Sequence, residues 1–353
     1  MTDTPYQLIL ANTQTQSDNC LWVMDESFPL SDVAKVAKQH TVITNRYDCY
    51  QAFKNTDHKV YFNDFELSNT ITSPIDCICY RVSKEKTVTH HVINQAFQKL
   101  PINGELHLSG FKGDGIKTYI DKTKSLFGEL VSLENGPNTA KYAVIRKTHE
   151  SLDVLDDKQY VEPREIFTIG EQGVISKPGV FGWNKEDQGS LFLSDNLSSV
   201  LENSKGKLEN VLDLGCGYGY LSLRAFHEQP LLRHARFTLT DNNAAAIHCA
   251  TINTQAHKVH ASVVADNAGQ QLNERFDLIL CNPPFHKGFD VSSDITEQFL
   301  KSTQRLLDKR GIALWVVNQF IGIEKRASTH FSNIEEVNRN KSFKLIALSK
   351  PKR

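Results

Sequence analysis

Long apolar segments are missing from this sequence of 353 residues. No hydrophobic run approaches the roughly 18 residues that a membrane-spanning helix needs. The first ten residues, MTDTPYQLIL, lack a basic region followed by an apolar one. We therefore expect a soluble, cytoplasmic protein with no membrane partner. Hydrophobic residues (40%) and charged residues (23%) occur in the proportions of a folded globular chain, which excludes a disordered or fibrous protein.

Metal-binding motifs are also missing. The seven cysteines include no CxxC pair, and the 13 histidines form no HExxH or similar ligand set. We interpret the cysteines as reduced, mostly buried thiols and expect no metal site. Cys77 and Cys79 alternate within an apolar run, which predicts that both sulfur atoms lie on one face of a sheet.

A marked excess of either charge is absent: the chain has 40 basic and 41 acidic side chains, a formal net charge of −1. The distribution is nevertheless uneven: residues 301–353 carry 12 basic and 4 acidic side chains, whereas residues 151–300 carry 12 and 20. Binding of a polyanion depends on the local electrostatic field and not on the net charge of the whole chain. The basic end is therefore a candidate phosphate contact, with a merely solvated face as the alternative; its members include Lys325, Arg326, Arg339, Lys341 and Lys344.

The length favours two domains, which we place at residues 1–160 and 161–353. The second half alternates apolar β-rich runs with segments of helical spacing, which predicts an α/β fold with a doubly wound, mainly parallel sheet. Expected strands are 210–214, 236–240, 259–265, 276–281, 312–317 and 343–348, and expected helices begin near 220, 243 and 294. The acidic stretch 152–177 has little periodicity and reads as a linker.

The first half repeats this scheme in degraded form. Residues 75–81 match 276–282, residues 104–110 match 311–317, and residues 141–147 resemble 343–349. A duplicated domain explains these matches together. The first copy has no glycine after Asp25, has Asn45 at the expected position of Asp241, and has Tyr80-Arg81-Val82 in place of an Asn-Pro-Pro segment. We therefore expect it to be a degenerate domain that serves in RNA docking or as a scaffold, including its basic stretch from Arg81 to Lys147.

The chemistry-bearing residues of the second half follow its strands. GxGxG at 215–219 lies between a strand and a helix, where glycine allows close approach of a ligand to the backbone. Asp213 could hold an ammonium group, Asp241 a ribose, and Asp266 an adenine amine. This set fits a ligand with those three groups and no pyrophosphate, and S-adenosylmethionine is such a ligand. One such acid alone would merely solvate a loop.

The segment Asn282-Pro283-Pro284-Phe285 ends the fourth of these strands. Two prolines remove two donors and fix φ, so the carbonyl groups before them stay free and rigidly aimed. An amide oxygen and a carbonyl oxygen can together accept both hydrogen atoms of an exocyclic NH₂ group. Phe285 offers a flat face on which a planar base can stack. A lone Pro-Pro would mark only a turn.

These motifs carry a family resemblance. VLDLGCGYGYLS (211–222) with CNPPFHKG (281–288) resembles the class I S-adenosylmethionine-dependent methyltransferases, and the whole chain resembles the ribosomal RNA small subunit methyltransferase C family. Pro178–Phe181 and Asp187–Ser190 support this resemblance, whereas Gly182-Trp183 departs from the family pattern. The resemblance implies two tandem Rossmann-like domains of which only the second is active. The implied catalytic residues are Asn282, Pro283, Pro284 and Phe285, and the implied cofactor-binding residues are Asp213, Gly215, Cys216, Gly217, Gly219, Asp241, Asn242, Asp266, Asn267 and Asn282.

The resemblance further implies methyl transfer to the exocyclic amino group of a guanine in 16S ribosomal RNA (activity class EC 2.1.1.172), with ribosomal RNA of the small subunit as partner and a monomeric enzyme. The closely related large subunit methyltransferase G family shares NPPFH, so 23S RNA is an alternative target. Adenine methylation and glutamine methylation of a protein use related motifs. A non-enzymatic RNA-binding module is the remaining alternative; it is disfavoured because the motifs survive in one copy and vanish in the other.

Overall fold

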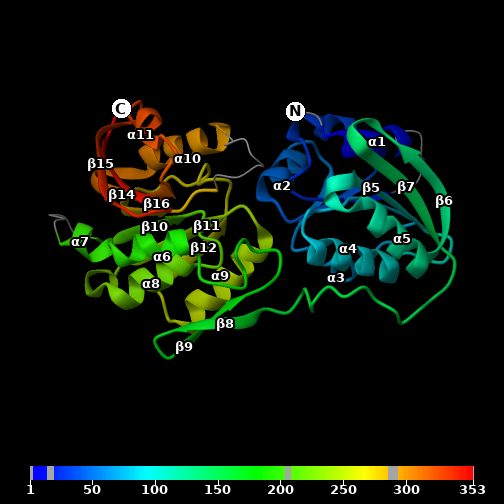
Figure 1. Ribbon diagram of the computed structural model, residues 1–353, viewed down its shortest axis with the longest axis horizontal. Helices are drawn as coiled ribbons and strands as arrows, with labels where there is room; N and C mark the ends of the chain where they lie inside the picture. The colour runs from blue at the N-terminus through cyan, green and yellow to red at the C-terminus, as the bar shows by residue number, and fades with distance from the viewer. Residues whose placement is uncertain (1–2, 14–19, 203–207, 285–292, 353) are drawn as a thin grey trace. The chain divides into compact units, whose positions relative to one another are not determined.

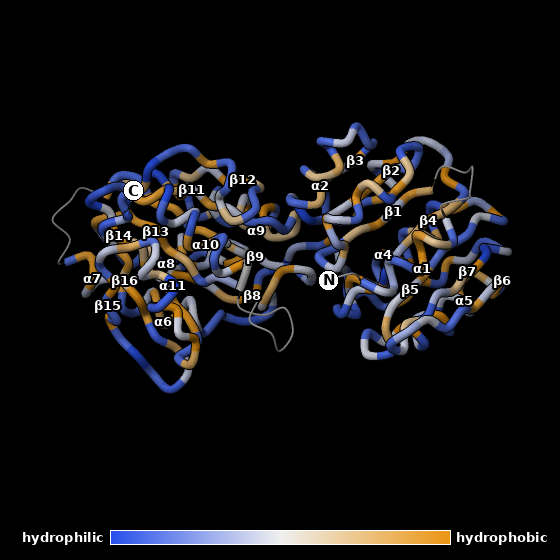
Figure 2. Tube along the Cα trace, turned by 90° about the horizontal axis from the view of Figure 1, so that it is seen from above, coloured by the Kyte–Doolittle hydropathy of each residue, from blue (hydrophilic) through white to orange (hydrophobic). Residues whose placement is uncertain are grey.

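The chain forms two compact units, residues 1–162 and 163–353, each built around one seven-stranded sheet (Figure 1). This computed structural model describes residues 3–13, 20–202, 208–284 and 293–352. No helix in these described ranges is both long and apolar enough to span a membrane. In Figure 2 the apolar colour concentrates on the strands inside each unit and the polar colour on the outer loops, as expected for two separate hydrophobic cores.

The second unit begins with an antiparallel hairpin and continues as an alternating α/β domain. Its elements are β8 (Arg164–Ile169), β9 (Gln172–Ser176), α6 (Gln188–Asp195), α7 (Leu197–Leu201), β10 (Asn210–Leu214), α8 (Tyr220–Glu228), η4 (Pro230–Leu232), β11 (Arg236–Asp241), α9 (Ala244–Ala256), β12 (Ala261–Ala265), β13 (Phe276–Cys281), α10 (Ser293–Leu306), β14 (Leu307–Asn318), α11 (Ile323–Ala327), β15 (Phe331–Arg339) and β16 (Phe343–Pro351). The hairpin lies within residues 152–177, so the interpretation of that whole stretch as a linker is wrong. Half-buried Phe167, against the rings of Tyr218 and Tyr220, ties it to the domain.

The sheet order of the second unit is β12-β11-β10-β13-β14-β16-β15. The first five strands are parallel to one another, and β16 pairs antiparallel with both of its neighbours, β14 and β15. The parallel strands therefore end at one edge, which we call the carboxyl edge. Ligands of doubly wound sheets bind outside this edge, where the strand order reverses between the central strands. Here that point lies between β10 and β13.

Apolar side chains that alternate along the central strands face two helical layers. Val211, Leu278 and Leu280 pack into one core with α6, α7, α8 and α9. Leu212, Ile279 and Cys281 pack into the other core with α10 and α11. Figure 1 shows these two groups of helices on opposite faces of the sheet. The expected doubly wound, mainly parallel architecture is confirmed.

The first unit has the same plan. Its elements are α1 (Thr4–Thr13), β1 (Cys20–Met24), η1 (Leu30–Lys35), β2 (Thr41–Thr44), α2 (Tyr47–Lys54), β3 (Lys59–Phe62), α3 (Leu67–Thr70), β4 (Cys77–Arg81), α4 (Lys86–Lys99), β5 (Glu105–Phe111), η2 (Lys112–Asp114), α5 (Ile116–Phe127), β6 (Gly128–Asn135), η3 (Pro137–Thr139) and β7 (Ala140–Lys147). The sheet order, β3-β2-β1-β4-β5-β7-β6, repeats that of the second unit strand for strand. The predicted duplication is therefore visible in the topology.

The strand ladders give the residue-by-residue equivalence of the two sheets. Val23 pairs with Tyr80 and Ile43, as Leu214 pairs with Cys281 and Thr240. Arg81 consequently occupies the position of Asn282, as the matched segments predicted. Two details of the prediction are wrong by one residue: Thr44, not Asn45, takes the position of Asp241, and residues 140–146, not 141–147, match 343–349. The cause is that short strand motifs align equally well at neighbouring offsets.

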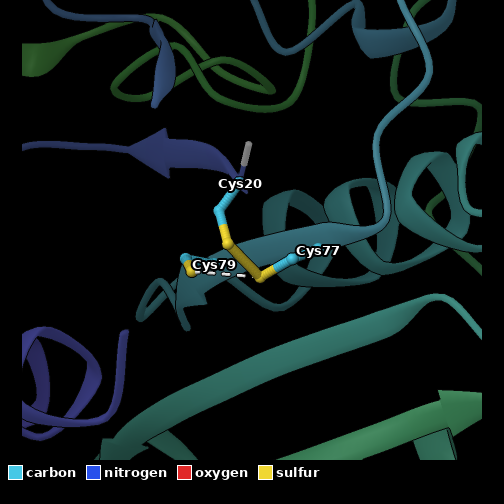
Figure 3. A group of neighbouring side chains, drawn as sticks. All are labelled: Cys20, Cys77 and Cys79. Atoms are coloured by element: carbon cyan, nitrogen blue, oxygen red, sulfur yellow. Dashed lines mark hydrogen bonds between the residues drawn. A yellow bond between two sulfur atoms is a disulfide. The ribbon is translucent and has the colours of Figure 1, made fainter. Parts of the chain in front are cut away.

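Three cysteines of the first unit cluster in its core (Figure 3). Cys20 and Cys77 are direct neighbours on β1 and β4 and form a disulfide, with Cα atoms 4.6 Å apart. This corrects the expectation that all seven cysteines are reduced; the sequence separation of 57 hid the pairing. The Cys79 sulfur lies 3.9 Å from that of Cys77, so the prediction that these two share a face is confirmed. The five other cysteines are buried and form no disulfide among the described residues.

Candidate active site

The glycine turn between β10 and α8 forms the centre of the carboxyl edge of the second unit. All three glycines have positive φ, +81° at Gly215, +56° at Gly217 and +91° at Gly219, which L side chains rarely adopt. A Cβ at Gly217 would meet no atom within 4 Å, so the turn is open on that side. Cys216 is buried, and its backbone nitrogen donates to the Thr240 carbonyl at 2.8 Å. The turn is therefore fixed by β11 while one side of its backbone stays accessible to a ligand.

Asp213 lies on β10 below this turn and is fully buried. Its Oδ2 accepts hydrogen bonds from the backbone nitrogen and the hydroxyl of Ser222, at 3.1 and 2.8 Å. Its Oδ1 has no partner among the described residues. Burial raises the pKa of this carboxyl to about 7. A buried acceptor without a donor fits the ammonium group for which the sequence predicts Asp213.

Asp241 ends β11 and organises the turn beside it. One carboxylate oxygen accepts from the Gly217 nitrogen at 3.0 Å, and the other from the Asn243 nitrogen at 2.9 Å. Each oxygen has a second lone pair that a ribose hydroxyl could use. Asn243 caps α9 by accepting from two backbone nitrogens of its first turn. The predicted ribose-binding carboxylate is thus held rigidly next to the open glycine.

The β12 end supplies the third acid. Asp266 is 1% exposed, and its Oδ2 accepts from the Gln271 nitrogen at 3.0 Å. Its Oδ1 is buried and has no partner among the described residues, and burial raises the pKa of the group. Asn242 donates to the Asn267 side chain at 3.3 Å, which joins the ends of β11 and β12. The structure therefore places the predicted cofactor-binding residues along one edge.

Asn282 follows β13 directly and is half-buried. Its Nδ2 donates to Asp187 at 2.6 Å and to Ser190 at 3.0 Å, whereas its Oδ1 has no partner among the described residues. Pro283 is buried and Pro284 exposed. Phe285, the predicted stacking residue, lies outside the described residues. Parallel pairing of Leu214 with Cys281 brings Asn282 beside the start of the glycine turn.

The first unit has different residues at the equivalent strand ends. Arg81 replaces Asn282, is 3% exposed and pairs with Asp3 and Asp114 at 3.2 and 2.9 Å. Thr44 replaces Asp241 and keeps one of its bonds, from the Arg46 nitrogen at 3.1 Å. Asp25 follows β1 without any glycine, and burial raises its pKa to about 7. The backbone frame has been retained, but an ion pair fills the strand end.

Only some of the basic side chains near the C-terminus are exposed and unpaired enough to contact phosphate. Lys344 is 4% exposed and pairs with Glu324, so its expected role as a phosphate contact is wrong. A position on β16 buries its side chain in the sheet, which composition alone could not show. Arg339 is exposed but forms a two-bond pair with Glu336. Lys325 and Lys341 are exposed and remain candidates.

Sequence reasoning missed three polar partners of the site. Asp187 and Ser190 bind Asn282, and Ser222 binds Asp213. The sequence identifies the Asp187–Ser190 segment only as a motif shared with the family. A possible signal was its pattern, Asp followed three residues later by Ser before an apolar run, which is typical of a helix N-cap.

The comparisons with known proteins agree with this geometry. Residues 171–347 match the family model "Methyltransferase small domain". Two curated relatives named "Ribosomal RNA small subunit methyltransferase C" come from Yersinia enterocolitica and Buchnera aphidicola; they are 28% and 27% identical to this chain. The alignments cover 86% of this chain and 83% of the Yersinia protein, and 91% and 90% for the Buchnera protein. The predicted resemblance to this family is confirmed.

A solved structure shares the fold over almost the whole chain. It is described as a T. Thermophilus 16S rRNA N2 G1207 methyltransferase in complex with AdoMet and guanosine. It covers 98% of this chain and 92% of its own, with a TM-score of 0.81 at 20% identity. Two tandem Rossmann-like units are therefore shown. With the family model spanning the strands that carry the glycine turn and Asn282, the chain belongs to the methyltransferase small domain family.

Proposed function

We propose that this chain transfers a methyl group from S-adenosylmethionine to the exocyclic amino group of a guanine in 16S ribosomal RNA. The observation that carries the proposal is Asn282, whose amide oxygen is unpaired among the described residues beside the glycine turn. The names of the curated relatives and of the T. Thermophilus structure support the same substrate. This proposed reaction corresponds to activity class EC 2.1.1.172.

The residues of the carboxyl edge fit the cofactor. Two buried carboxyl oxygens, on Asp213 and Asp266, have no donor among the described residues. Gly217 leaves open space where a side chain would otherwise stand. Asp213 would hold the ammonium group, Asp241 the ribose, and Asp266 with Asn267 the adenine. When bound, S-adenosylmethionine supplies an electrophilic methyl group on a sulfonium, and the transfer leaves a thioether and releases one proton.

Asn282 would act on the nucleophile. Its Oδ1 and the carbonyl oxygen of Pro283 would accept the two hydrogen atoms of the guanine amino group, which favours a tetrahedral nitrogen with a localised lone pair. Placement of that nitrogen in line with the methyl group can lower the barrier by several kcal/mol. No strong base is required, because the amine becomes more acidic as it is alkylated and water or Asn282 can accept the proton. Phe285 would stack on the base after it leaves its own stack.

Two exposed aromatic residues near the carboxyl edge support an RNA substrate. Phe320 follows β14 by two residues and is 86% exposed, and Phe181 is 82% exposed. The Phe181 loop reaches this edge through Gly179, whose carbonyl oxygen accepts from Asn243 at 3.1 Å. Gln319, next to Phe320, donates to the Ser342 carbonyl at 3.0 Å, which brings exposed Lys341 close. Aromatic faces with nearby cations are typical of surfaces that bind single-stranded RNA.

The experiment uses the purified full-length chain with labelled cofactor and 16S or 23S RNA, each free and in its subunit, followed by nucleoside analysis. We expect a methylated guanine amino group from the 16S substrate, with the first unit contributing to RNA docking and the enzyme acting as a monomer. Replacement of Asn282 by Ala should lower turnover at least 100-fold while cofactor binding stays measurable. Label in 23S RNA or protein, or unchanged turnover of N282A, would contradict the proposal.

A further inference from the structure

Two groups at the N-terminus of α6 hold the side-chain amide of Asn282. Asp187 Oδ2 accepts from Asn282 Nδ2 at 2.6 Å, and Ser190 Oγ accepts from the same nitrogen at 3.0 Å. Both donated hydrogen atoms of the amide are thereby used. The partners come from a segment 92–95 residues earlier in the chain, which is not part of the strand-end motifs.

These contacts determine which way the amide faces. A carboxylate oxygen only accepts hydrogen bonds, so the NH₂ group must point towards Asp187; the opposite orientation would put two acceptor oxygens 2.6 Å apart. Asn282 Oδ1 is then directed away from Asp187 and has no partner among the described residues. We propose that Asp187 and Ser190 are positioning residues, which lock the Asn282 amide with its oxygen presented to the substrate amino group.

Asp187 is itself immobilised. It caps α6 by accepting from the Ser190 nitrogen at 2.7 Å. The preceding residues are tied to the glycine turn and to the first residue of α8, because the hydroxyls of Tyr218 and Tyr220 donate to the Lys185 carbonyl at 3.3 Å and to Glu186 at 3.1 Å. The position of Asp187 is therefore coupled to the glycine turn.

Gly189 leaves room for the hydrogen bonds of Asp187 and Ser190 to the Asn282 amide. A Cβ at this position would lie 3.3 Å from Asn282 Nδ2 and 3.4 Å from Asp187 Oδ2. Any side chain here would crowd the hydrogen bond between them. The glycine thus permits close approach of α6 to the strand end.

The first unit has an equivalent capping aspartate, but an arginine replaces the amide at its strand end. Asp3 accepts from the Tyr6 nitrogen at 3.0 Å at the start of α1, and it pairs with Arg81, the counterpart of Asn282, at 3.2 Å. A capping aspartate that reaches the strand end is therefore common to both units. Only in the second unit does it hold an amide whose oxygen is left for a ligand. Asp3 is consequently a matched control for a purely structural role.

The test compares Asp187→Ala with Asp3→Ala in the full chain. We expect D187A to lower kcat at least tenfold, with cofactor Kd within about twofold, because the amide can then flip. D3A loses the same kind of cap and should keep kcat. Asp187→Asn retains an acceptor oxygen for Asn282 and should recover most of the turnover. Ser190→Ala leaves the carboxylate in place and should lower kcat severalfold, which keeps the test decisive if D187A does not fold.

A double variant separates positioning from other roles. In the N282A background, D187A should reduce the residual turnover by less than twofold, because there is no amide left to orient. Equal loss of kcat in D187A and D3A, or an undiminished effect of D187A in the N282A background, would overturn the positioning role. The inference rests on the proposed function, but the two can fail separately. Full turnover in N282A would contradict the proposed function. Loss of turnover in N282A with full turnover in D187A would contradict only the positioning role of Asp187.

Discussion

Asp213 accepts two hydrogen bonds from Ser222, through the backbone nitrogen at 3.1 Å and the hydroxyl at 2.8 Å, at the base of the glycine turn. The other carboxyl oxygen is buried without a donor among the described residues, and burial raises the pKa to about 7. Such a group destabilises the protein without a ligand, because a buried charge lacks compensation. The same charge becomes favourable once a cation binds next to it.

The first prediction concerns Asp213→Asn. Since the folded pKa lies above the unfolded value of 3.8, the wild-type protein loses stability as pH rises from about 4 to about 7. The neutral amide escapes this loss, so D213N should be more stable than wild type by on the order of 1–3 kcal/mol at pH 8, and the gain should shrink towards pH 4. Thermal or urea denaturation across this pH range measures it.

The same variant should bind S-adenosylmethionine at least tenfold more weakly at pH 8, because a charge-assisted hydrogen bond to the ammonium is lost. Asp25→Asn is the control, since burial also raises the pKa of Asp25 to about 7 in the unit without a glycine turn. D25N should show a similar pH-dependent gain with unchanged cofactor affinity. Equal affinity of D213N and wild type would exclude Asp213 from the cofactor site.

The second prediction concerns the open side of the glycine turn. Gly217→Ala places a methyl group into the open space where we propose that the cofactor binds, and it should weaken cofactor binding at least tenfold. The backbone conformation, φ +56°, adds a strain of about 1 kcal/mol for alanine. Gly170→Ala is matched, because Gly170 has φ +63° and equally open surroundings in the β8–β9 turn. Calorimetric titration of both variants should show weakened binding only for G217A; parallel losses would assign the effect to backbone strain.

Much of this arrangement could be predicted because it depends on local sequence. A strand, a glycine turn and a helix follow one another over 210–228, and the acids at 241 and 266 directly end or follow strands, so parallel pairing must gather them at one edge. The polar edge strand β15 was not predicted, because its exposed residues show no apolar alternation. The contact between Asp187 and Asn282 could not be predicted either. It joins residues 95 positions apart, and only tertiary packing of α6 on β14 and β16 brings them together.

The third prediction concerns the exposed aromatic residue after β14. Phe320→Ala should raise the KM for RNA at least about fivefold and leave cofactor affinity unchanged, because stacking on one base contributes about 1–3 kcal/mol. Leu231 is also a large exposed apolar residue, at 61% exposure, and lies after α8 away from the carboxyl edge. Leu231→Ala should leave the KM unchanged. A common small effect of both variants would show that Phe320 does not contact RNA.

The last prediction concerns the salt dependence of RNA binding. Each lysine that neutralises a phosphate releases about one counterion, so its removal lowers the slope of log K against log salt by roughly 0.7–0.9. Lys325 and Lys341 are exposed, and Lys325→Ala with Lys341→Ala should together reduce the slope by about 1.5 without altering the cofactor Kd. Lys344 should behave differently although it belongs to the same basic segment. Its side chain is 4% exposed and paired with Glu324, so Lys344→Met should change stability and leave the slope unchanged. Filter binding between 50 and 300 mM salt distinguishes the cases, and an unchanged slope in the double variant would place the phosphate contacts elsewhere on the chain.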